Sequence, residues 1–379
     1  MRKLKDIMRN MLNRVTGSGA SLFERHLHFH YSRQFKRYLK NLGIPNSPVE
    51  GEEEYIKKWG VFNGKVEPYS HRLFSRFMGP SPDIVPEDIG HAYIEDVLNP
   101  PLFPAYYSDK NLFEETFKEG TLPKTVARRI GGSILLDKDY QPLTEEIKSN
   151  SDRLILKPSA GTSSGVGVEL FVKSDKGYVN STTGEVLTRE YLTRYGDDLI
   201  LQEAVRQSEY VSYFCKTAVN TIRLATYRSV KDERVHVTAG ILRIGRDGEF
   251  VDNAHAGGVY LGVNTETGEL GKTAFDQYGN QTKEWNGIDF SKSAFKLPNW
   301  EEVVEFAKYI GSSNHHSRLL ALDIALDEND KPKLIEYNIR WFSYWLFMFN
   351  GQLPLGEFTD EIIEHCLKHK RNRRQIRIV

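Results

Sequence analysis

Two carboxylates and one amide near the end of the chain stand in the pattern D…E-x-N. Asp323 lies in the apolar run LLALDIAL, and Glu336 and Asn338 lie in KLIEYN, which follows the turn sequence DENDKP. Side chains two apart on a strand point to the same face, so Glu336 and Asn338 share a face and Asp323 can face them across a hairpin. Hard oxygen donors of this kind suit Mg²⁺ that bridges phosphates. Taken alone, each of these acids is most simply explained as a solvent-exposed residue at the end of a strand.

A loop of small residues follows an apolar run that ends in a lysine. The stretch LILKPSAGTSSGVG (154–167) places Lys157 before three glycines and three serines. Backbone N–H groups of such a loop can approach an anion closely, and Lys157 can supply a positive charge beside it. The stretch is equally compatible with a β-hairpin that has a flexible tip.

A third group lies at the end of the apolar run LILQEAV (199–205). Gln202, Glu203 and Val205 end this predicted strand. The strand edge offers backbone N–H and C=O groups to the rim of a purine, and a carboxylate can accept a hydrogen bond from a ribose hydroxyl. Each of these features alone has a simple structural explanation. A lysine-glycine loop, a strand edge and a D…E-x-N hairpin in this order together favour a functional site.

Length and composition set the class of protein. The chain has 379 residues, enough for two or three subdomains with their own cores, and its 39% hydrophobic and 27% charged residues are typical of a folded soluble protein. The net charge of +0 gives no reason to expect nucleic acid as a partner. Cys215 and Cys366 are far apart in sequence and indicate no disulfide framework, so we expect a reducing cytoplasm. Since no run of about 18 apolar residues occurs, no membrane-spanning helix is expected.

Basic residues gather at both ends of the chain. Residues 1–40 hold ten Lys and Arg against Asp6 and Glu24, and the C-terminal KHKRNRRQIRIV has no acid. Apolar residues of the first twelve positions fall near helical spacing, which predicts a basic amphipathic helix. Such a helix can rest on anionic lipid, although a solvated face with its apolar stripe docked on the body is the more common arrangement, and we favour it.

The pattern of elements changes along the chain. Residues 1–45 and several pieces of 52–99 are predicted to be helical, and a proline-rich link (99–111) follows. From there helices and strands alternate. The predicted helices are 110–119, 144–150, 188–196 and 300–313, and the predicted strands lie in 124–136, 199–205, 217–229, 234–245, 259–270 and the hairpin 318–340.

This order of motifs resembles the ATP-grasp superfamily, and most closely its sugar-transfer-associated branch, which is related to α-L-glutamate ligases. The resemblance covers residues 60–350 and is carried by SDKNLFEETF, PKTVARRIGG, ILKPSAGTSSGVGV, VNTIRLATYR, LRIGRDGEFVDNAHAGGVYLGV and ALDIAL…KLIEYN. It implies an α+β, ATP-grasp fold, in which two lobes hold ATP between them, preceded by a mainly helical N-terminal region. The implied division is 1–105 for the helical, Pro-rich region, 106–200 for the N-lobe with its phosphate flap, and 201–379 for the C-lobe with the metal site and a basic tail.

The resemblance also implies roles for single residues. Lys157 resembles the lysine that contacts the α- and β-phosphates, and Arg223, in NTIR, resembles the arginine that steadies the transferring phosphoryl group and the acyl-phosphate. The implied phosphate flap contains Ser163, Ser164, Gly165 and Gly167. The implied adenine and ribose contacts are Gln202, Glu203 and Val205, and the implied magnesium ligands are Asp323, Glu336 and Asn338.

Further positions have less decisive roles. Arg128 and Arg129 lie where many ATP-grasp proteins have an earlier phosphate-binding lysine, and we favour Arg129 for this ATP contact. In the loop DNAHAGG, Asn253 and His255 either complete Asx turns or face the substrate or a phosphate, and we favour the second. Arg340 is either a partner for a substrate carboxylate or a member of an ion pair on the rim.

The resemblance implies an ATP- and Mg²⁺-dependent, ADP-forming carboxylate–amine ligase that acts through an acyl-phosphate. The context implied is surface polysaccharide or related glycan biosynthesis, with a small-molecule or glycan carboxylate and an amine as partners. One alternative is a kinase on the same fold that stops at phosphoryl transfer. Another is a non-catalytic nucleotide-binding scaffold at the membrane surface, against which the complete set of Lys157, Asp323, Glu336 and Asn338 argues. The expected location is the cytoplasm. There the protein is either free or attached to the inner face of the membrane through its basic termini.

Overall fold

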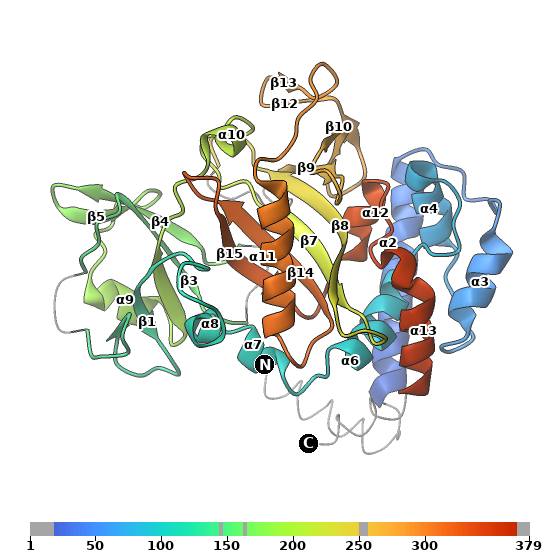
Figure 1. Cartoon of the computed structure of the whole chain (residues 1–379), viewed down its shortest axis with the longest axis horizontal. Coiled ribbons are helices and arrows are strands. Elements are labelled where there is room, and N and C mark those ends of the chain that lie inside the picture. Colours follow the sequence, from blue (N-terminus) through green and yellow to red (C-terminus); the bar gives the residue numbers. More distant parts are fainter. Residues whose placement is uncertain (1–18, 144–146, 162–164, 250–256, 370–379) are drawn as a thin grey trace. The chain divides into compact units, whose positions relative to one another are not determined.

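The computed structural model describes residues 19–143, 147–161, 165–249 and 257–369, and the chain forms two compact units (Figure 1). One unit comprises the described part of residues 102–339, and the other comprises the described parts of 1–101 and 340–379. The division at residues 105 and 200 remains a prediction. In the structure, the segment from Arg340 onward belongs to the same unit as the N-terminal helices.

The first sheet of the 102–339 unit consists of antiparallel strands in the order β2-β1-β6-β3-β4-β5. Helix α9 (Arg189–Tyr195) begins after Thr188, whose side chain caps it, and contributes Tyr191 and Leu192 to the apolar core of this sheet. Alternation places Leu154 and Leu156 of β3 in that core and Ile155 and Lys157 on the opposite face. The strands are β1 (Thr125–Arg129), β2 (Leu136–Asp137), β3 (Arg153–Pro158), β4 (Glu169–Ser174), β5 (Gly177–Asn180) and β6 (Leu199–Glu203).

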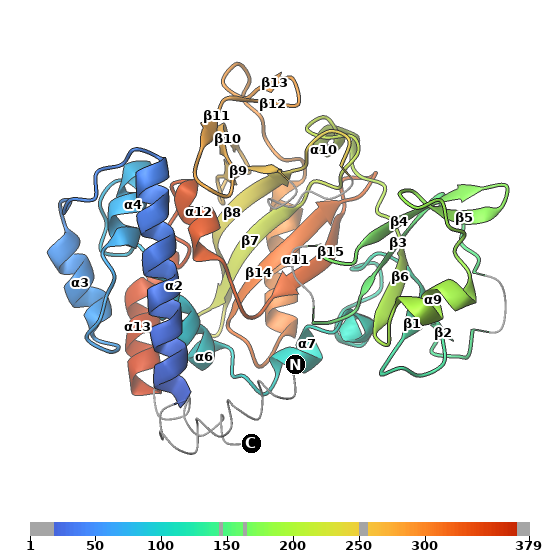
Figure 2. The ribbon, with the colours of Figure 1, turned by 180° about the vertical axis from the view of Figure 1, so that it is seen from behind.

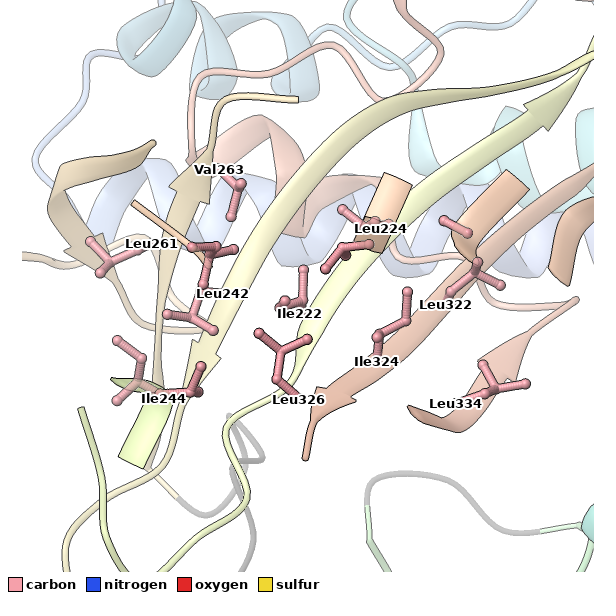
Figure 3. Close-up of a cluster of buried hydrophobic side chains, with 14 of the residues drawn as sticks. Ile222, Leu224, Leu242, Ile244, Leu261, Val263, Leu322, Ile324, Leu326 and Leu334 are labelled. Atoms are coloured by element: carbon pink, nitrogen blue, oxygen red, sulfur yellow. The ribbon is translucent and has the colours of Figure 1, made fainter. Parts of the chain in front are cut away.

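The second sheet of this unit follows the order β11-β10-β9-β8-β7-β14-β15. Its strands carry apolar side chains at alternate positions, and these side chains form one cluster on the face that helix α11 (Trp300–Ser313) covers (Figure 3). The strands are β7 (Ile222–Arg228), β8 (Val235–Ile244), β9 (Val259–Val263), β10 (Leu270–Phe275), β11 (Gln281–Thr282), β14 (Leu319–Leu326) and β15 (Pro332–Asn338).

Shorter elements complete the 102–339 unit. Strands β12 (Glu284–Trp285) and β13 (Ile288–Asp289) form a separate pair, and α7 (Pro104–Tyr107) and α10 (Glu209–Ser212) are single turns. The helix predicted over 110–119 is a 3₁₀ turn (Lys110–Leu112) followed by α8 (Phe113–Thr116). It stops early because Phe117 is extended and Gly120 has a positive φ of 83°.

The prediction of a helix over 144–150 is wrong for the described part of that range, because residues 147–150 are not helical. Serine side chains hold this segment in local turns instead. The Ser149 hydroxyl accepts a hydrogen bond from the backbone N–H of Ser151 at 3.0 Å, and it also bonds the Glu203 carboxylate. Serine favours such side chain–backbone bonds over a regular helix.

The other unit is helical, as the sequence predicts. It holds α2 (Gly19–Asn41), α3 (Glu52–Gly60), α4 (Tyr69–Met78), α5 (Glu87–Ile89), a π-helical turn (Gly90–Ile94), α6 (Glu95–Leu98), α12 (Tyr344–Phe349) and α13 (Thr359–Lys368) (Figure 2). Aromatic side chains fill its core, where the Phe35 ring of α2 meets the Phe74 ring of α4 at 5.5 Å between ring centres. None of the described helices combines the length and the apolar composition needed to span a bilayer.

Candidate active site

Three charged side chains lie in one row across the middle of the second sheet. Asp323 on β14 is paired with Arg223 on β7 and with Glu336 on β15. Their neighbours Ile222 and Leu322 belong to the apolar core, so the three charged side chains lie on the opposite face of the sheet. The hairpin that the D…E-x-N pattern predicts is thereby confirmed, because β14 and β15 pair antiparallel.

Asp323 is the centre of a buried ion-pair cluster. Arg223 donates from Nε to Oδ1 and from Nη2 to Oδ2, both at 2.7 Å, and Arg243 on β8 donates to Oδ2 at 3.0 Å. Burial by itself would raise the pKa of Asp323, but the charges of Arg223 and Arg243 outweigh burial and hold that pKa below its usual value. Asp323 is therefore a permanent carboxylate, and Arg243 is a member of the site that the sequence analysis missed.

The oxygen donors at the Glu336 edge of this row fit a magnesium ion. The Glu336 side chain is 37% exposed, so its carboxylate remains accessible. Among the described residues, none accepts a hydrogen bond from the buried Nδ2 of Asn338. This N–H donor suits an acceptor such as a phosphate oxygen, which leaves the amide oxygen of Asn338 for a metal. The same described set contains no group of three His, Cys, Asp or Glu side chains placed to hold a metal, so Asn338 and the nucleotide would have to complete the site.

Two lysines converge on Glu336 from other elements. Lys110 Nζ lies 3.5 Å from Glu336 Oε2, and the backbone N–H of Lys110 donates to the carbonyl of Ser159, at the start of the small-residue loop, at 2.9 Å. Lys157 on β3 is buried. Burial, and to a smaller extent the charge of Lys110, lower its pKa to about 7 against the opposing charge of Glu336. Two lysines beside one carboxylate can supply an excess of positive charge to a polyphosphate, fully so once Lys157 is protonated.

The two arginines of β1 lie on opposite faces of the first sheet. Arg128 is paired with Ile200, which is paired with Lys157, so Arg128 shares the Lys157 face. Arg129 is paired with Leu199 of the apolar core. Its guanidinium donates to the carbonyls of Thr193 and Gly196 at the end of α9 and to those of Gly132 and Ser133 after β1. The phosphate contact expected from Arg129 is therefore not part of the site that we propose.

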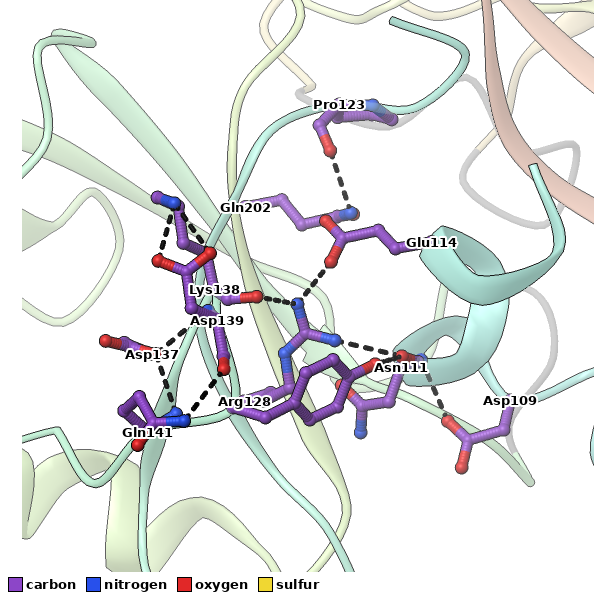
Figure 4. A network of polar contacts seen from close by, with 11 residues as sticks. Asp109, Asn111, Glu114, Pro123, Arg128, Asp137, Lys138, Asp139, Gln141 and Gln202 are labelled. Carbon is purple, nitrogen blue, oxygen red and sulfur yellow. Dashed lines mark hydrogen bonds and ion pairs between the residues drawn. The ribbon is translucent and has the colours of Figure 1, made fainter. Parts of the chain in front are cut away.

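Arg128 holds the segment that carries Lys110 (Figure 4). Its guanidinium donates to the Asn111 carbonyl at 3.0 Å and to the Lys138 carbonyl at 3.1 Å, and it forms an ion pair with Glu114. The ring of Tyr140 lies against it, with 4.0 Å between the guanidinium carbon and the ring centre. Because this arginine is completely buried, it acts as an anchor for the 110–114 segment rather than as a ligand group.

The segment that links β6 of the first sheet to β7 of the second borders a cavity of about 260 Å³. Ile155, Leu170 and Val205 give it an apolar side, and Lys216 and Thr217 lie on the side of the second sheet. Its volume is near the lower end of the ~300–1,000 Å³ range of small-molecule sites. Of the three predicted adenine and ribose contacts, Val205 lines this cavity.

The other two predicted contacts lie at the neighbouring strand end and are engaged elsewhere. Gln202 donates from Nε2 to the Pro123 carbonyl at 3.1 Å (Figure 4). Glu203 bonds the Ser149 hydroxyl, and its Oε1 lies 3.8 Å from Lys124 Nζ. Their roles toward a nucleotide remain predictions.

Part of the predicted phosphate flap is described. Gly165 and Gly167 have positive φ values of 72° and 81°, which glycine adopts without strain. A Cβ on Gly167 would lie 3.1 Å from Pro158 Cγ, so a larger residue would crowd the strand that carries Lys157. Ser163, Ser164, Asn253 and His255 lie outside the described residues.

Arg340 lies past the end of β15, in the helical unit. Its Nη2 is 2.6 Å from Oδ1 of the buried Asp96. The next residues form a strained turn, in which Trp341 has a φ of 60° and is 53% exposed. The Glu95 carboxylate accepts hydrogen bonds from the backbone N–H groups of Trp341 and Phe342 at 2.9 and 3.1 Å, which holds this turn in place. A substrate contact of Arg340 remains a prediction.

Comparison with solved structures finds two ligases and a synthetase among the similar chains, at low identity. The D-alanine–D-alanine ligase from Bacillus anthracis is 13% identical over 70% of this chain and 69% of its own, with a TM-score of 0.37. D-cycloserine synthetase DcsG is 15% identical over 71% and 73%, with a TM-score of 0.39. The L-amino acid ligase from Bacillus licheniformis is 12% identical over 81% and 60%, with a TM-score of 0.33. Scores this low carry no argument about activity. No curated protein sequence matches the chain.

A family model decides the relationship. The model described as sugar-transfer associated ATP-grasp matches residues 90–357, which is more than half of the chain. The predicted α+β ATP-grasp fold with a helical N-terminal region is confirmed. The chain belongs to the sugar-transfer associated ATP-grasp family.

Proposed function

We propose that the protein is an ATP- and Mg²⁺-dependent ligase that joins a carboxylate to an amine through an acyl-phosphate and releases ADP. The observation that carries this proposal is the convergence of Lys110 and Lys157 on Glu336, next to the row formed by Arg223 and Asp323. A triphosphate needs cations on one side and metal-binding oxygens on the other, and this region of the 102–339 unit offers both.

Different residues of this unit would bind the phosphates, the base and the metal ion of the nucleotide. Lys110 and Lys157 bind phosphate oxygens, and the apolar wall of Ile155 and Val205 takes the flat face of the base. Glu336 and Asn338, with a remaining lone pair of Asp323, would hold Mg²⁺, which would neutralise phosphate charge. Binding of an anion beside Lys157 restores the positive charge that burial disfavours.

In this proposal Arg223 stabilises the transferring group. Its Nε and Nη2 each donate one hydrogen bond to Asp323, so the N–H groups of Nη1 and the second N–H of Nη2 can donate to a phosphoryl oxygen. A carboxylate oxygen of the acid attacks the γ-phosphorus, the bond to the β,γ-bridging oxygen breaks, and ADP leaves. The amine then attacks the carbonyl carbon of the acyl-phosphate, phosphate leaves, and the amine loses a proton. A guanidinium fixed by a buried carboxylate is preorganised for the charge that develops in the first step.

The acid is sought first among uronic acids and other glycan carboxylates, because the family description concerns sugar transfer. A kinase that transfers phosphate to a hydroxyl would use the same lysines and oxygens, so it is the second candidate. The two differ in the fate of the phosphoryl group: a ligase yields ADP and free phosphate, and a kinase yields ADP and a phosphorylated product.

Hydroxylamine in place of the natural amine tests this proposal. It is small enough to enter most amine sites, and it converts an acyl-phosphate into a hydroxamate. With an acid from a screen of uronic acids and amino-acid carboxylates, the ligase forms ADP, phosphate and a hydroxamate in equal amounts. ADP without a hydroxamate would replace the ligase by the kinase, and AMP would contradict both.

A further inference from the structure

Helix α2 (Gly19–Asn41) presents a basic outer face that the proposed ligase activity does not use. Its inner face is buried, with Leu27, Phe35 and Leu39 in the core of the helical unit. The basic amphipathic helix predicted over the first twelve residues lies outside the described residues. In α2 itself, the docked inner face leaves the opposite side exposed. We call that exposed side the α2 stripe; it consists of Leu22, Arg25, His26, Phe29, His30, Arg33, Lys36, Arg37 and Lys40.

The α2 stripe is continuous, and its charged residues are all positive. Its members recur every three or four residues, so they lie along one side of the helix over about 27 Å at 1.5 Å per residue. Five of the nine are Lys or Arg, and the acid of this helix, Glu24, is half-buried off the stripe. Considering only the residues that the structure describes, none of the five cations forms an ion pair with a carboxylate. Lys36 and Arg37 instead lie over the rings of Tyr69 and Tyr38, at 5.8 and 5.9 Å.

Two apolar side chains interrupt the cations on the same line. Phe29 is 65% exposed and Leu22 is 39% exposed, and they are two helical turns apart. The combination of cations and apolar side chains on one line is what an interfacial helix uses, because the ring can enter the boundary between headgroups and acyl chains while Lys and Arg contact the phosphates.

We propose that the α2 stripe docks the protein on the surface of a bilayer that contains anionic phospholipids. Charge complementarity supplies the attraction, and Phe29 with Leu22 supplies a shallow anchor. Nucleic acid is the other polyanion to consider, but two apolar side chains on the contact line disfavour a phosphate backbone. The proposal does not depend on the ligase activity.

Co-sedimentation of the full-length protein with vesicles tests the charge. We expect binding to phosphatidylcholine vesicles that contain phosphatidylserine, much weaker binding to phosphatidylcholine alone, and a decrease at high salt. The triple variant Arg33→Gln, Lys36→Gln, Arg37→Gln should bind about 100-fold more weakly, since each cation contributes about fivefold, or ~1 kcal/mol.

A matched control distinguishes binding through the α2 stripe from binding driven by the net charge of the protein. The variant Lys173→Gln, Lys176→Gln, Arg189→Gln removes three exposed cations of the other unit and should bind as the wild type does. Equal loss in both variants would show that net charge alone drives the binding and would overturn the proposal. So would a wild-type protein that does not bind these vesicles, or a stripe variant that retains full affinity.

A probe at Phe29 tests the anchor. Cys215 and Cys366 are both buried, so the variant Phe29→Cys can be labelled selectively with an environment-sensitive fluorophore. Its emission should shift to the blue with phosphatidylserine vesicles and remain unchanged with a single-stranded or double-stranded oligonucleotide. An oligonucleotide that binds the stripe while vesicles do not would replace the bilayer by nucleic acid.

Discussion

Replacement of Lys110 by methionine is the most direct test of the convergence of charges around Glu336. The Lys110 side chain is nine-tenths buried, and methionine fills nearly the same volume without the ammonium group. The backbone N–H that donates to Ser159 is unchanged by this substitution, so the small-residue loop keeps its attachment. The variant therefore removes one charge and little packing.

The first expected effect of Lys110→Met is weaker binding of ATP. A charge-assisted hydrogen bond to a phosphate contributes about 1.5–3 kcal/mol, which corresponds to a dissociation constant about 10- to 150-fold higher. Calorimetric titration with a non-hydrolysable ATP analogue measures it. The control is Lys173→Met, which removes an exposed lysine of the same unit on β4 and should leave the affinity unchanged.

The second expected effect concerns the proton on Lys157. Its pKa is lowered to about 7 by burial and by the charge of Lys110, so the empty wild-type site is partly deprotonated near neutral pH and takes up a proton when phosphate binds. Without Lys110 the pKa of Lys157 rises, more of it is already protonated, and the proton uptake at slightly alkaline pH decreases. Titration in two buffers of different ionisation enthalpy measures this uptake. Unchanged affinity together with unchanged proton uptake would remove Lys110 from the site.

Three further substitutions test other parts of the structure. Glu336→Gln should severely reduce Mg²⁺-dependent turnover with an unchanged circular dichroism spectrum, and a variant with wild-type turnover would exclude Glu336 as a ligand. Lys157→Met should weaken ATP binding yet raise the thermal unfolding midpoint, because the wild-type lysine is buried with a lowered pKa. That gain should be largest below pH 7 and shrink between pH 7 and 10.5, so scanning calorimetry that finds an equal gain at about pH 6 and about pH 10 contradicts it. Gly90→Ala should destabilise the helical unit by ~1–3 kcal/mol in denaturant titrations, because its Cβ would clash with the Tyr344 ring, and an additive double variant with Tyr344→Ala would refute this cause.

The second sheet could be predicted from the sequence because its signals are local. Strands β7 and β8 place apolar residues at alternate positions, whereas β14 is a nearly continuous apolar run that is buried along its whole length, and both patterns predict strands. The pairing of Asp323 with Glu336 follows from one short turn between adjacent strands. Local pattern and hairpin geometry together were sufficient to place the oxygen donors of the site.

Lys110 could not be found in the same way, because its place depends on tertiary contacts. It lies in a 3₁₀ turn that the sequence presents as the start of an ordinary helix. What directs it to the site is the bond of its backbone to Ser159 and the anchoring of the neighbouring Asn111 by Arg128. Neither contact has a sequence signal, and the Asp109 cap of this turn was the feature that could have drawn attention to it.

The sequence could not decide between Arg128 and Arg129 for a related reason. Adjacent residues of a strand point to opposite faces, so one of the two had to face Lys157, but the sequence does not reveal which face of β1 carries the core. The irregular pairing of β1 with β6 between Thr125 and Ala127 shifts the register in a way that no periodicity records. The residue on the correct face, Arg128, then proved to be an anchor with every described contact directed at protein groups.

The pairing of Arg223 with Asp323 changes how variants of either residue must be read. The sequence assigns them separate roles, a phosphoryl contact and a metal ligand, whereas the structure joins them through two hydrogen bonds of 2.7 Å. Loss of Arg223 would leave Asp323 buried with Arg243 as its remaining cation, and loss of Asp323 would leave two arginines without their common partner. A fall in rate in either single variant therefore reports both roles at once. A double-mutant cycle over Arg223 and Asp323 separates them, because a coupling energy close to the full single-mutant effect would mean that the carboxylate serves the reaction by fixing the guanidinium.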